Sequence, residues 1–99
     1  VKNCTLVEDG IAMFPDAPTA RGLKHLQELM TLKRDGCRAV IFILVQRCDA
    51  DHFAPADQID PAYGEALRQS VSAGVEIMSW DVSMDLDGIS LNRQLDCRL

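Results

Sequence analysis

RAVIFILVQ, residues 38–46, is the stretch that decides the fold class. Its side chains are apolar at odd and even positions alike, so it lacks the alternation of a half-exposed strand. The apolar part, 39–45, is far shorter than the roughly 20 residues that a membrane-spanning helix needs. The stretch therefore predicts a strand at the centre of a sheet, buried on both faces by helices.

A helix is predicted directly before this strand. Apolar residues recur at helical spacing over about 18–34, which predicts an amphipathic helix. Thr19 or Asp16 can cap its start, and Gly36 stands just beyond its end, where glycine is common. Gly22 lies inside the helix, where it costs about 1 kcal/mol relative to alanine. That cost indicates a close approach by another part of the backbone or by a ligand.

A second helix is predicted after the strand. Asp60 suits the N-cap and Pro61 suits the first helical position, so we expect a helix over 61–74. Residues 48–60, between the strand and this helix, are polar and acidic. They are expected to form a solvated loop, because their spacing matches no calcium-binding loop pattern.

The outer parts of the chain complete the order of elements. Four runs are rich in strand-forming residues: KNCTLV (2–7), IAMF (11–14), VEIMSWDV (75–82) and ISLNRQL (89–95). Asp9-Gly10 predicts a hairpin and Asp87-Gly88 a turn, because such pairs tolerate positive φ. Met78 and Trp80 are expected in the core. The order β-β-α-β-α-β-β predicts an α/β fold, a mixed sheet with helices packed on it in one domain.

Charge is unevenly distributed along the 99 residues, whose net charge is −5. Residues 1–47 hold seven basic and five acidic residues, whereas 48–99 hold three basic and ten acidic ones. Nucleic acid needs local positive charge, so any contact with it is expected in the first half or in a further domain.

The four cysteines form no C-x-x-C pair, and none has further ligands at zinc spacing. Reduced thiols in a cytoplasmic protein are expected. The chain shows no membrane segment, and it begins with Val inside a strand-like pattern. We therefore expect a fragment of a longer protein.

The start of the first predicted helix is unusually basic. Arg21, Lys24, His25 and Glu28 recur at spacings of three and four, so they share one helix face. Cations at a helix N-terminus oppose the helix dipole, so an ordinary surface would favour acids there. The pattern predicts a phosphate-binding face made by Arg21, Lys24 and His25, with a hydroxyl from Thr19. A merely solvated basic face is the alternative.

Lys2 is the other candidate. It shares a strand face with Cys4 and Leu6, both of which look core-directed. A lysine pointing that way is unusual unless it is paired or lines a cleft. The alternative is a lysine at a frayed chain end that reaches water.

Three stretches together resemble the C-terminal part of the sugar fermentation stimulation protein A (SfsA) family: VKNCTLVEDGIAMFPDAPTARGLKHLQEL (1–29), GCRAVIFILVQR (36–47) and FAPADQIDPAYGEALRQSVSAGVEI (53–77). The resemblance implies a bacterial or archaeal cytoplasmic protein with an N-terminal OB-fold-like domain and a C-terminal domain resembling PD-(D/E)xK nucleases. Residues 1–99 would be a single C-terminal fragment of that two-domain protein. Family members are described as DNA-binding regulators of sugar-utilisation genes and as DNA or RNA nucleases.

The resemblance also assigns roles. The family strand reads Glu-x-Lys-Asn-x-Thr-Leu, which Lys2, Asn3, Thr5 and Leu6 match, with the Glu one residue before Val1. In nucleases of this fold that Glu and an upstream Asp hold a divalent metal such as Mg²⁺, and the Lys positions or activates the attacking water. Lys2 would thus be catalytic, while Thr19, Arg21, Lys24 and His25 would be auxiliary. The fragment itself holds no metal ligands and is expected to be inactive.

Two functions remain open on these grounds. One is a Mg²⁺-dependent nuclease completed by residues outside the chain. The other is a non-catalytic DNA-binding regulator in which this domain serves structure or dimerisation, so that homo-oligomerisation stays open. A small-molecule sensor at Gln46 and Arg47, where the central strand ends, is a third reading without specific support.

Overall fold

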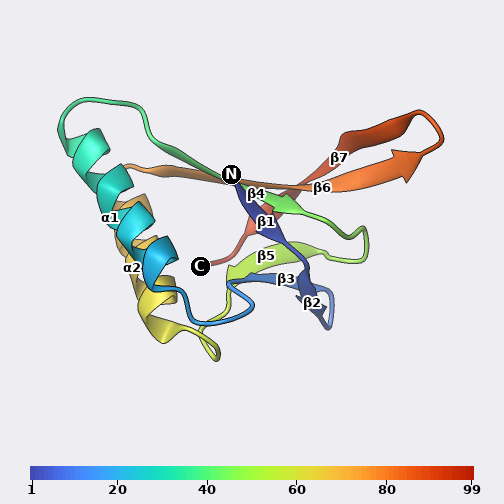
Figure 1. Ribbon diagram of the computed structural model, residues 1–99, viewed down its shortest axis with the longest axis horizontal. Coiled ribbons are helices and arrows are strands. Elements are labelled where there is room, and N and C mark those ends of the chain that lie inside the picture. Colours follow the sequence, from blue (N-terminus) through green and yellow to red (C-terminus); the bar gives the residue numbers. More distant parts are fainter.

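The computed structural model describes residues 1–99 as a seven-stranded mixed sheet with two helices on one side (Figure 1). The elements in chain order are β1 (Lys2–Cys4), β2 (Leu6–Glu8), β3 (Ile11–Phe14), α1 (Ala20–Arg34), β4 (Val40–Val45), β5 (His52–Pro55), α2 (Pro61–Ser72), β6 (Glu76–Asp85) and β7 (Gly88–Cys97). The predicted mixed α/β class is confirmed. Neither helix has the length and apolar content that crossing a bilayer requires.

The sheet is nearly closed like a barrel. Its strand order is β1-β4-β6-β7-β5-β3-β2, yet β1 and β2 are separated in the chain by Thr5 alone. β1 and β2, the two edge strands of the sheet, therefore lie next to each other. The buried Cys4 thiol donates a hydrogen bond to the Met13 carbonyl at 3.1 Å and so links β1 to β3 across this seam.

The start of the chain and the predicted loop 48–60 both differ from expectation. The expected single strand over 2–7 is divided at Thr5, because β1 pairs with β4 and β2 pairs with β3. The loop contains β5, which pairs in parallel with β3 and with β7. β5 has only four residues and ends in Pro55, so its sequence is too short to show the alternation of a strand. The strands with which it pairs, β3 and β7, lie far away in the sequence.

The hairpin between β2 and β3 is confirmed. Asp9 and Gly10 have φ values of 52° and 78°, as a two-residue turn of this kind requires. The Asp51 backbone N–H donates to the Gly10 carbonyl at 2.6 Å, so the turn is also held by the segment that leads into β5.

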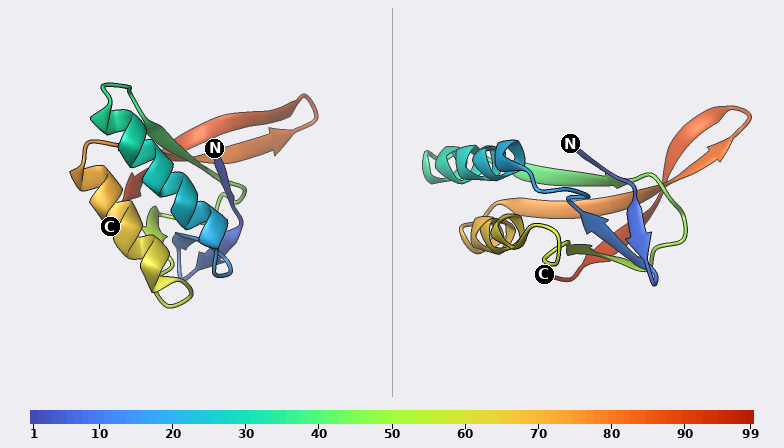
Figure 2. Two further views of the ribbon diagram at one scale, coloured as in Figure 1. Left: turned by 60° about the vertical axis from the view of Figure 1, so that its left-hand side comes forward. Right: turned by 60° about the horizontal axis from the view of Figure 1, so that its bottom comes forward.

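The two helices lie side by side with their N-terminal ends together (Figure 2). The Asp60 carboxylate joins these ends, since it accepts from the Tyr63 backbone N–H at 3.1 Å and from the Thr19 backbone N–H at 2.9 Å. The Thr19 hydroxyl in turn caps α1 by accepting from the Gly22 N–H at 2.9 Å. Both predicted caps are therefore confirmed.

Gly22 permits a close approach by side chains, and not by the backbone or ligand that its position indicated. A Cβ at this residue would lie 2.7 Å from Thr19 Cγ2 and 3.1 Å from Tyr63 Cε2. The neighbour is thus a side chain of α2, which packs tightly on α1 at this point. Tyr63 is fully buried and also meets Phe14 edge to face, with 5.4 Å between the ring centroids.

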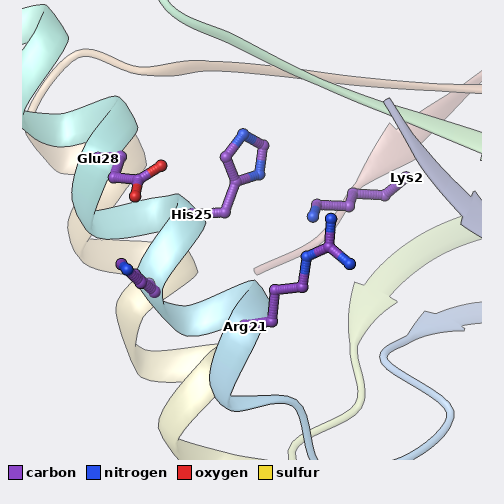
Figure 3. Close-up of a pocket in the computed structure, with 5 residues that line it drawn as sticks. Lys2, Arg21, His25 and Glu28 are labelled. Carbon is purple, nitrogen blue, oxygen red and sulfur yellow. The ribbon is translucent and has the colours of Figure 1, made fainter.

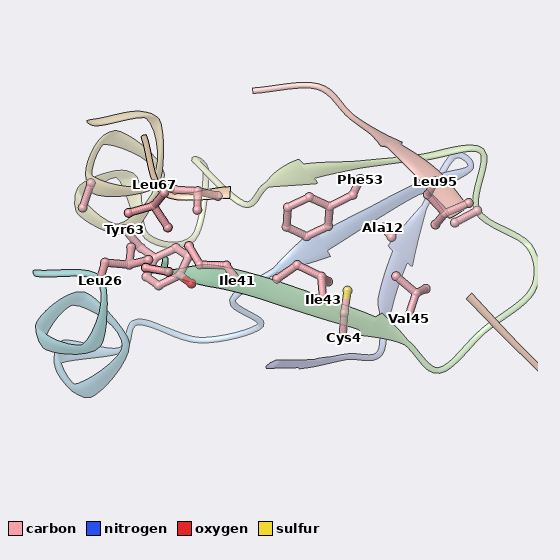
Figure 4. Packing of buried hydrophobic residues seen from close by; sticks show 14 residues of the cluster. Cys4, Ala12, Leu26, Ile41, Ile43, Val45, Phe53, Tyr63, Leu67 and Leu95 are labelled. Carbon is pink, nitrogen blue, oxygen red and sulfur yellow. The ribbon is translucent and has the colours of Figure 1, made fainter. Parts of the chain in front are cut away.

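The core extends from the space between the helices and the sheet into the interior of the nearly closed sheet (Figure 4). Leu26 of α1 and Leu67 of α2 pack there with Ile41, Ile43 and the other buried side chains of the sheet. All four cysteines are free.

Burial of the central strand on both faces was a wrong prediction. Along β4 the side chains alternate between buried and more exposed, because both helices cover the same side of the sheet. Phe42 and Leu44 pair in register with Met78 and Trp80, and all four are only partly buried on the other side. The expectation that Met78 and Trp80 lie in the core is therefore also wrong.

The strands β6 and β7 extend beyond the sheet as a projecting ribbon (Figure 1). At its base the register shifts between Trp80 and Val82. The fully buried Asp81 carboxylate accepts from Arg93 twice, from its backbone N–H at 2.7 Å and from Nε at 2.9 Å. Arg93 Nη2 also donates to the Ala50 carbonyl at 2.7 Å. Asp81 and Arg93 thus lock the base of the ribbon to the segment before β5.

Candidate functional site

A cavity of about 340 Å³ lies between the start of β1 and the first half of α1 (Figure 3). Its lining is entirely polar: Lys2, Arg21, Lys24, His25 and Glu28. The cavity unites the two groups of candidates that the sequence placed far apart, the strand lysine and the basic helix face.

The backbone explains how these side chains meet. Lys2 and Cys4 point to the same side of β1, which is the side that faces the helices. Arg21, His25 and Glu28 follow one another at helical spacing along α1. The ends of the Lys2 and Arg21 side chains approach each other across the cavity (Figure 3).

The cations of the cavity form no ion pair. Each of the five ion pairs of the structure uses an arginine located elsewhere, at position 38, 47, 68, 93 or 98. Lys2, Arg21 and Lys24 therefore share the lining with Glu28 as its single carboxylate. Like charges held together without a partner favour an anionic ligand.

Burial and the neighbouring cations shift two pKa values in the cavity. Burial lowers the pKa of Lys2, and the charge of Arg21 lowers it further. Burial likewise lowers the pKa of His25 below 6.5. The positive charges of Lys2, of the chain terminus and of Arg21 lower this pKa further, whereas the negative charge of Glu28 raises it. His25 Nδ1 is shielded from water and has no hydrogen-bond partner, so a proton placed there would be unpaired. His25 is thus neutral at pH 7.

Four of the five predicted site residues come together here. Thr19 does not line the cavity; its hydroxyl caps α1 by accepting from the Gly22 N–H. Glu28 does line it, although it was not among the predicted site residues. Its place in the same three-and-four spacing as Arg21 and His25 was the signal that could have identified it.

These 99 residues do not supply a metal centre. No group of three or more His, Cys, Asp or Glu side chains is arranged to hold a metal ion. Glu28 and His25 alone do not make the oxygen-rich ligand set that Mg²⁺ or Ca²⁺ requires. In the acidic segment 48–60, Asp49 and Asp57 form ion pairs with Arg47 and Arg68.

Comparison with known proteins identifies relatives over nearly the whole chain. The sugar fermentation stimulation protein homologs of Geobacter sulfurreducens and Syntrophobacter fumaroxidans are each 55% identical to it, over 95 and 94 residues. These matches cover 96% and 95% of this chain but 41% and 36% of the relatives. The chain therefore spans about two fifths of the length of such curated relatives.

A solved structure and a family model agree with these relatives. The structure of Pyrococcus furiosus SfsA in complex with Ca²⁺ matches 99% of this chain and 43% of its own, with a TM-score of 0.92 and 36% identity. The model of the sugar fermentation stimulation protein RE domain matches residues 1–88. The chain belongs to the sugar fermentation stimulation protein (SfsA) family.

Proposed function

We propose that this chain provides the phosphate-binding side of a nucleic-acid site, and that the full-length protein is a divalent-metal-dependent nuclease. The observation that carries the proposal is the convergence on one cavity of Lys2, Arg21 and Lys24, none of which forms an ion pair, together with His25. In a chain of net charge −5, such a local cluster of cations attracts an anion.

Each side chain has a distinct task in this proposal. Lys2 contacts the scissile phosphate, where its charge offsets the negative charge that develops during cleavage. Its lowered pKa makes it a readier proton carrier than an ordinary lysine. Arg21 can donate two parallel hydrogen bonds to phosphate oxygens, and Lys24 adds a further positive charge.

Metal binding belongs to the full-length protein in this proposal. Divalent-metal chemistry is supported by the Ca²⁺ complex of the Pyrococcus furiosus relative and by the resemblance of the Lys2 strand to a nuclease motif. The ligands for Mg²⁺ would lie outside residues 1–99. The part assigned to this chain is limited to holding and neutralising phosphate, in a cytoplasmic protein whose partner is DNA.

The test is cleavage of labelled single- and double-stranded DNA by the full-length protein with Mg²⁺ or Mn²⁺. We expect activity that EDTA abolishes and that Lys2→Ala lowers by about a hundredfold, the scale of removing one transition-state contact. Lys33→Ala is the matched control, since Lys33 is an exposed cation in the last turn of the same helix. Equal activity of Lys2→Ala and wild type would contradict the assigned role.

A non-catalytic DNA-binding regulator is the second candidate, favoured by the net acidity of the chain. In that case EDTA and Lys2→Ala would leave DNA binding unchanged, while rising salt would weaken it steeply. No cleavage under any metal, together with such binding, would replace the nuclease by this function.

A further inference from the structure

The side of the sheet that faces away from both helices carries an apolar surface (Figure 2). The strands β1, β4 and β6 run parallel to one another here, and alternate side chains of β4 and β6 point to this side. Phe42 pairs in register with Met78 and Leu44 with Trp80, so the apolar side chains of the two strands lie next to one another. We call this surface the outer face and define it by five residues: Val40, Phe42, Leu44, Met78 and Trp80.

The outer face is not fully covered by any element of residues 1–99. Val40 is 36% exposed, and the other four side chains are partly buried. Parallel strands are normally covered on both faces, whereas antiparallel strands can face water on one side. On the antiparallel strand β7, Gln94 pairs with Trp80 and is polar and exposed. The apolar surface thus ends where the parallel strands end, as expected of a surface that a further part of the protein covers.

Nucleic acid does not suit the outer face. None of its five residues is a cation, and Glu76, which pairs in register with Val40, is engaged in an ion pair with Arg38 at 2.6 Å. Binding of a phosphate backbone requires local positive charge, and stacking of bases on aromatic rings is normally combined with it. The occupant is therefore an apolar protein surface.

A second copy of the chain is too weak an occupant for this surface. A stable dimer buries roughly 800 Å² on each partner. Even an aromatic side chain contributes only about 150–250 Å² when it is buried completely. The five side chains of the outer face are already more than half buried, so together they remain well below the area that a dimer requires.

The N-terminal end of the chain lies beside the outer face, whereas the C-terminal end does not. Val1 leads directly into β1, where Asn3 pairs with Leu44 of the outer face. Near the other end, Cys97 pairs with Phe53 of β5, and the strands β6 and β7 separate β5 from β4 in the sheet. Residues that precede Val1 in a longer polypeptide therefore emerge next to the outer face.

We propose that the segment preceding Val1 in the full-length protein covers the outer face with apolar side chains. Relatives are more than twice as long as this chain, so proteins of this family have the length that such a segment requires. The segment is joined to the face through β1, and a short connection gives it an effective concentration of about millimolar. It therefore occupies this small surface at protein concentrations at which a second copy does not bind.

The first experiment is photo-cross-linking in the full-length protein. Val40 is replaced by p-benzoylphenylalanine, and products are mapped by mass spectrometry in a mixture of unlabelled and isotope-labelled protein. We expect cross-links to residues that precede Val1, with both cross-linked peptides carrying the same isotope. Ser90, an exposed polar position on the projecting ribbon, is the matched control and should give no such product. Cross-links between labelled and unlabelled chains, cross-links only to residues beyond Leu99, or none at all would overturn the proposal.

The second experiment measures how strongly the outer face is shielded. Val40→Cys and Ser90→Cys are prepared in the full-length protein, and their reaction with a maleimide is followed peptide by peptide. Both positions are exposed within residues 1–99, so a difference in rate reports coverage by the rest of the protein. We expect Val40→Cys to react at least about tenfold more slowly, a modest resistance to local opening. Equal rates in variants that circular dichroism shows to be folded would refute the coverage.

Discussion

Replacing Asp81 should cost more stability than replacing any other carboxylate of the chain. Its side chain has no exposure and accepts two hydrogen bonds from Arg93, one of them from a backbone N–H at the register shift of β6 and β7. Breaking a buried pair by removing one partner costs about 3–5 kcal/mol. The Arg93 side chain is about half exposed and can regain water, so we expect the low end, about 3 kcal/mol, for Asp81→Ala.

The assay is urea unfolding of the full-length protein, monitored by Trp80 fluorescence and far-UV circular dichroism. Asp81→Asn should lie between wild type and Asp81→Ala, because it keeps an acceptor for the Arg93 N–H and loses the charge. Asp96→Ala is the matched control, since the Asp96 side chain is exposed and its ion pair with Arg98 is long at 3.7 Å. Exposed pairs of this kind contribute at most about 1 kcal/mol. A loss below about 1 kcal/mol for Asp81→Ala would refute the reasoning that the pair locks the ribbon.

Three further changes test the site and the helix pair. Lys2→Met should raise the pKa of His25 toward its ordinary 6.5, measured by NMR titration, because one of the charges that oppose its protonation is lost. Because the pKa of His25 is lowered in the folded state, the folded state binds fewer protons than the unfolded state below pH 6.5. The free energy of unfolding should therefore fall as the pH drops below 6.5, and it should fall less in Lys2→Met. Equal pH profiles of the two proteins would contradict this. Gly22→Ala should lower the free energy of unfolding by about 1 kcal/mol, because the crowding of the new methyl group against Tyr63 and Thr19 outweighs the gain in helix propensity. A more stable variant in urea unfolding would show that these side chains shift to make room. Asp60→Ala should cost about 1–2 kcal/mol in the same assay, since it removes acceptors at two helix ends, and a loss within error would mean that water replaces them.

Local signals in the sequence were reliable. The Asp9-Gly10 turn and both helix starts follow from a few neighbouring residues, and the structure contains them as expected. The basic face of α1 was also predictable, because spacings of three and four in a helix bring side chains together whatever the rest of the chain does. Thr19 was correctly a capping candidate, but the structure does not place it in the cavity lining.

Features that depend on distant partners could not be predicted in this way. Phe53 is fully buried because β5 lies between β3 and β7, and its four residues carry no period of their own. The apolar run of β4 indicated burial on two faces, since composition cannot reveal that both helices cover the same side of the sheet. Lys2 became a strong candidate only through the family resemblance, because its partners begin about 20 residues further along the chain.

The division of the N-terminal strand at Thr5 has a consequence for biosynthesis. β2 and β3 are adjacent in the sequence and can pair as soon as both have left the ribosome. β1 must wait for β4, about 40 residues later, which at 5–20 residues per second corresponds to several seconds of translation. During that interval Lys2 and Cys4 lie on an unpaired edge next to a hairpin that is already formed. β1 therefore stays unpaired after the neighbouring hairpin has formed, and a chain arrested before β4 would expose this edge to chaperones and proteases.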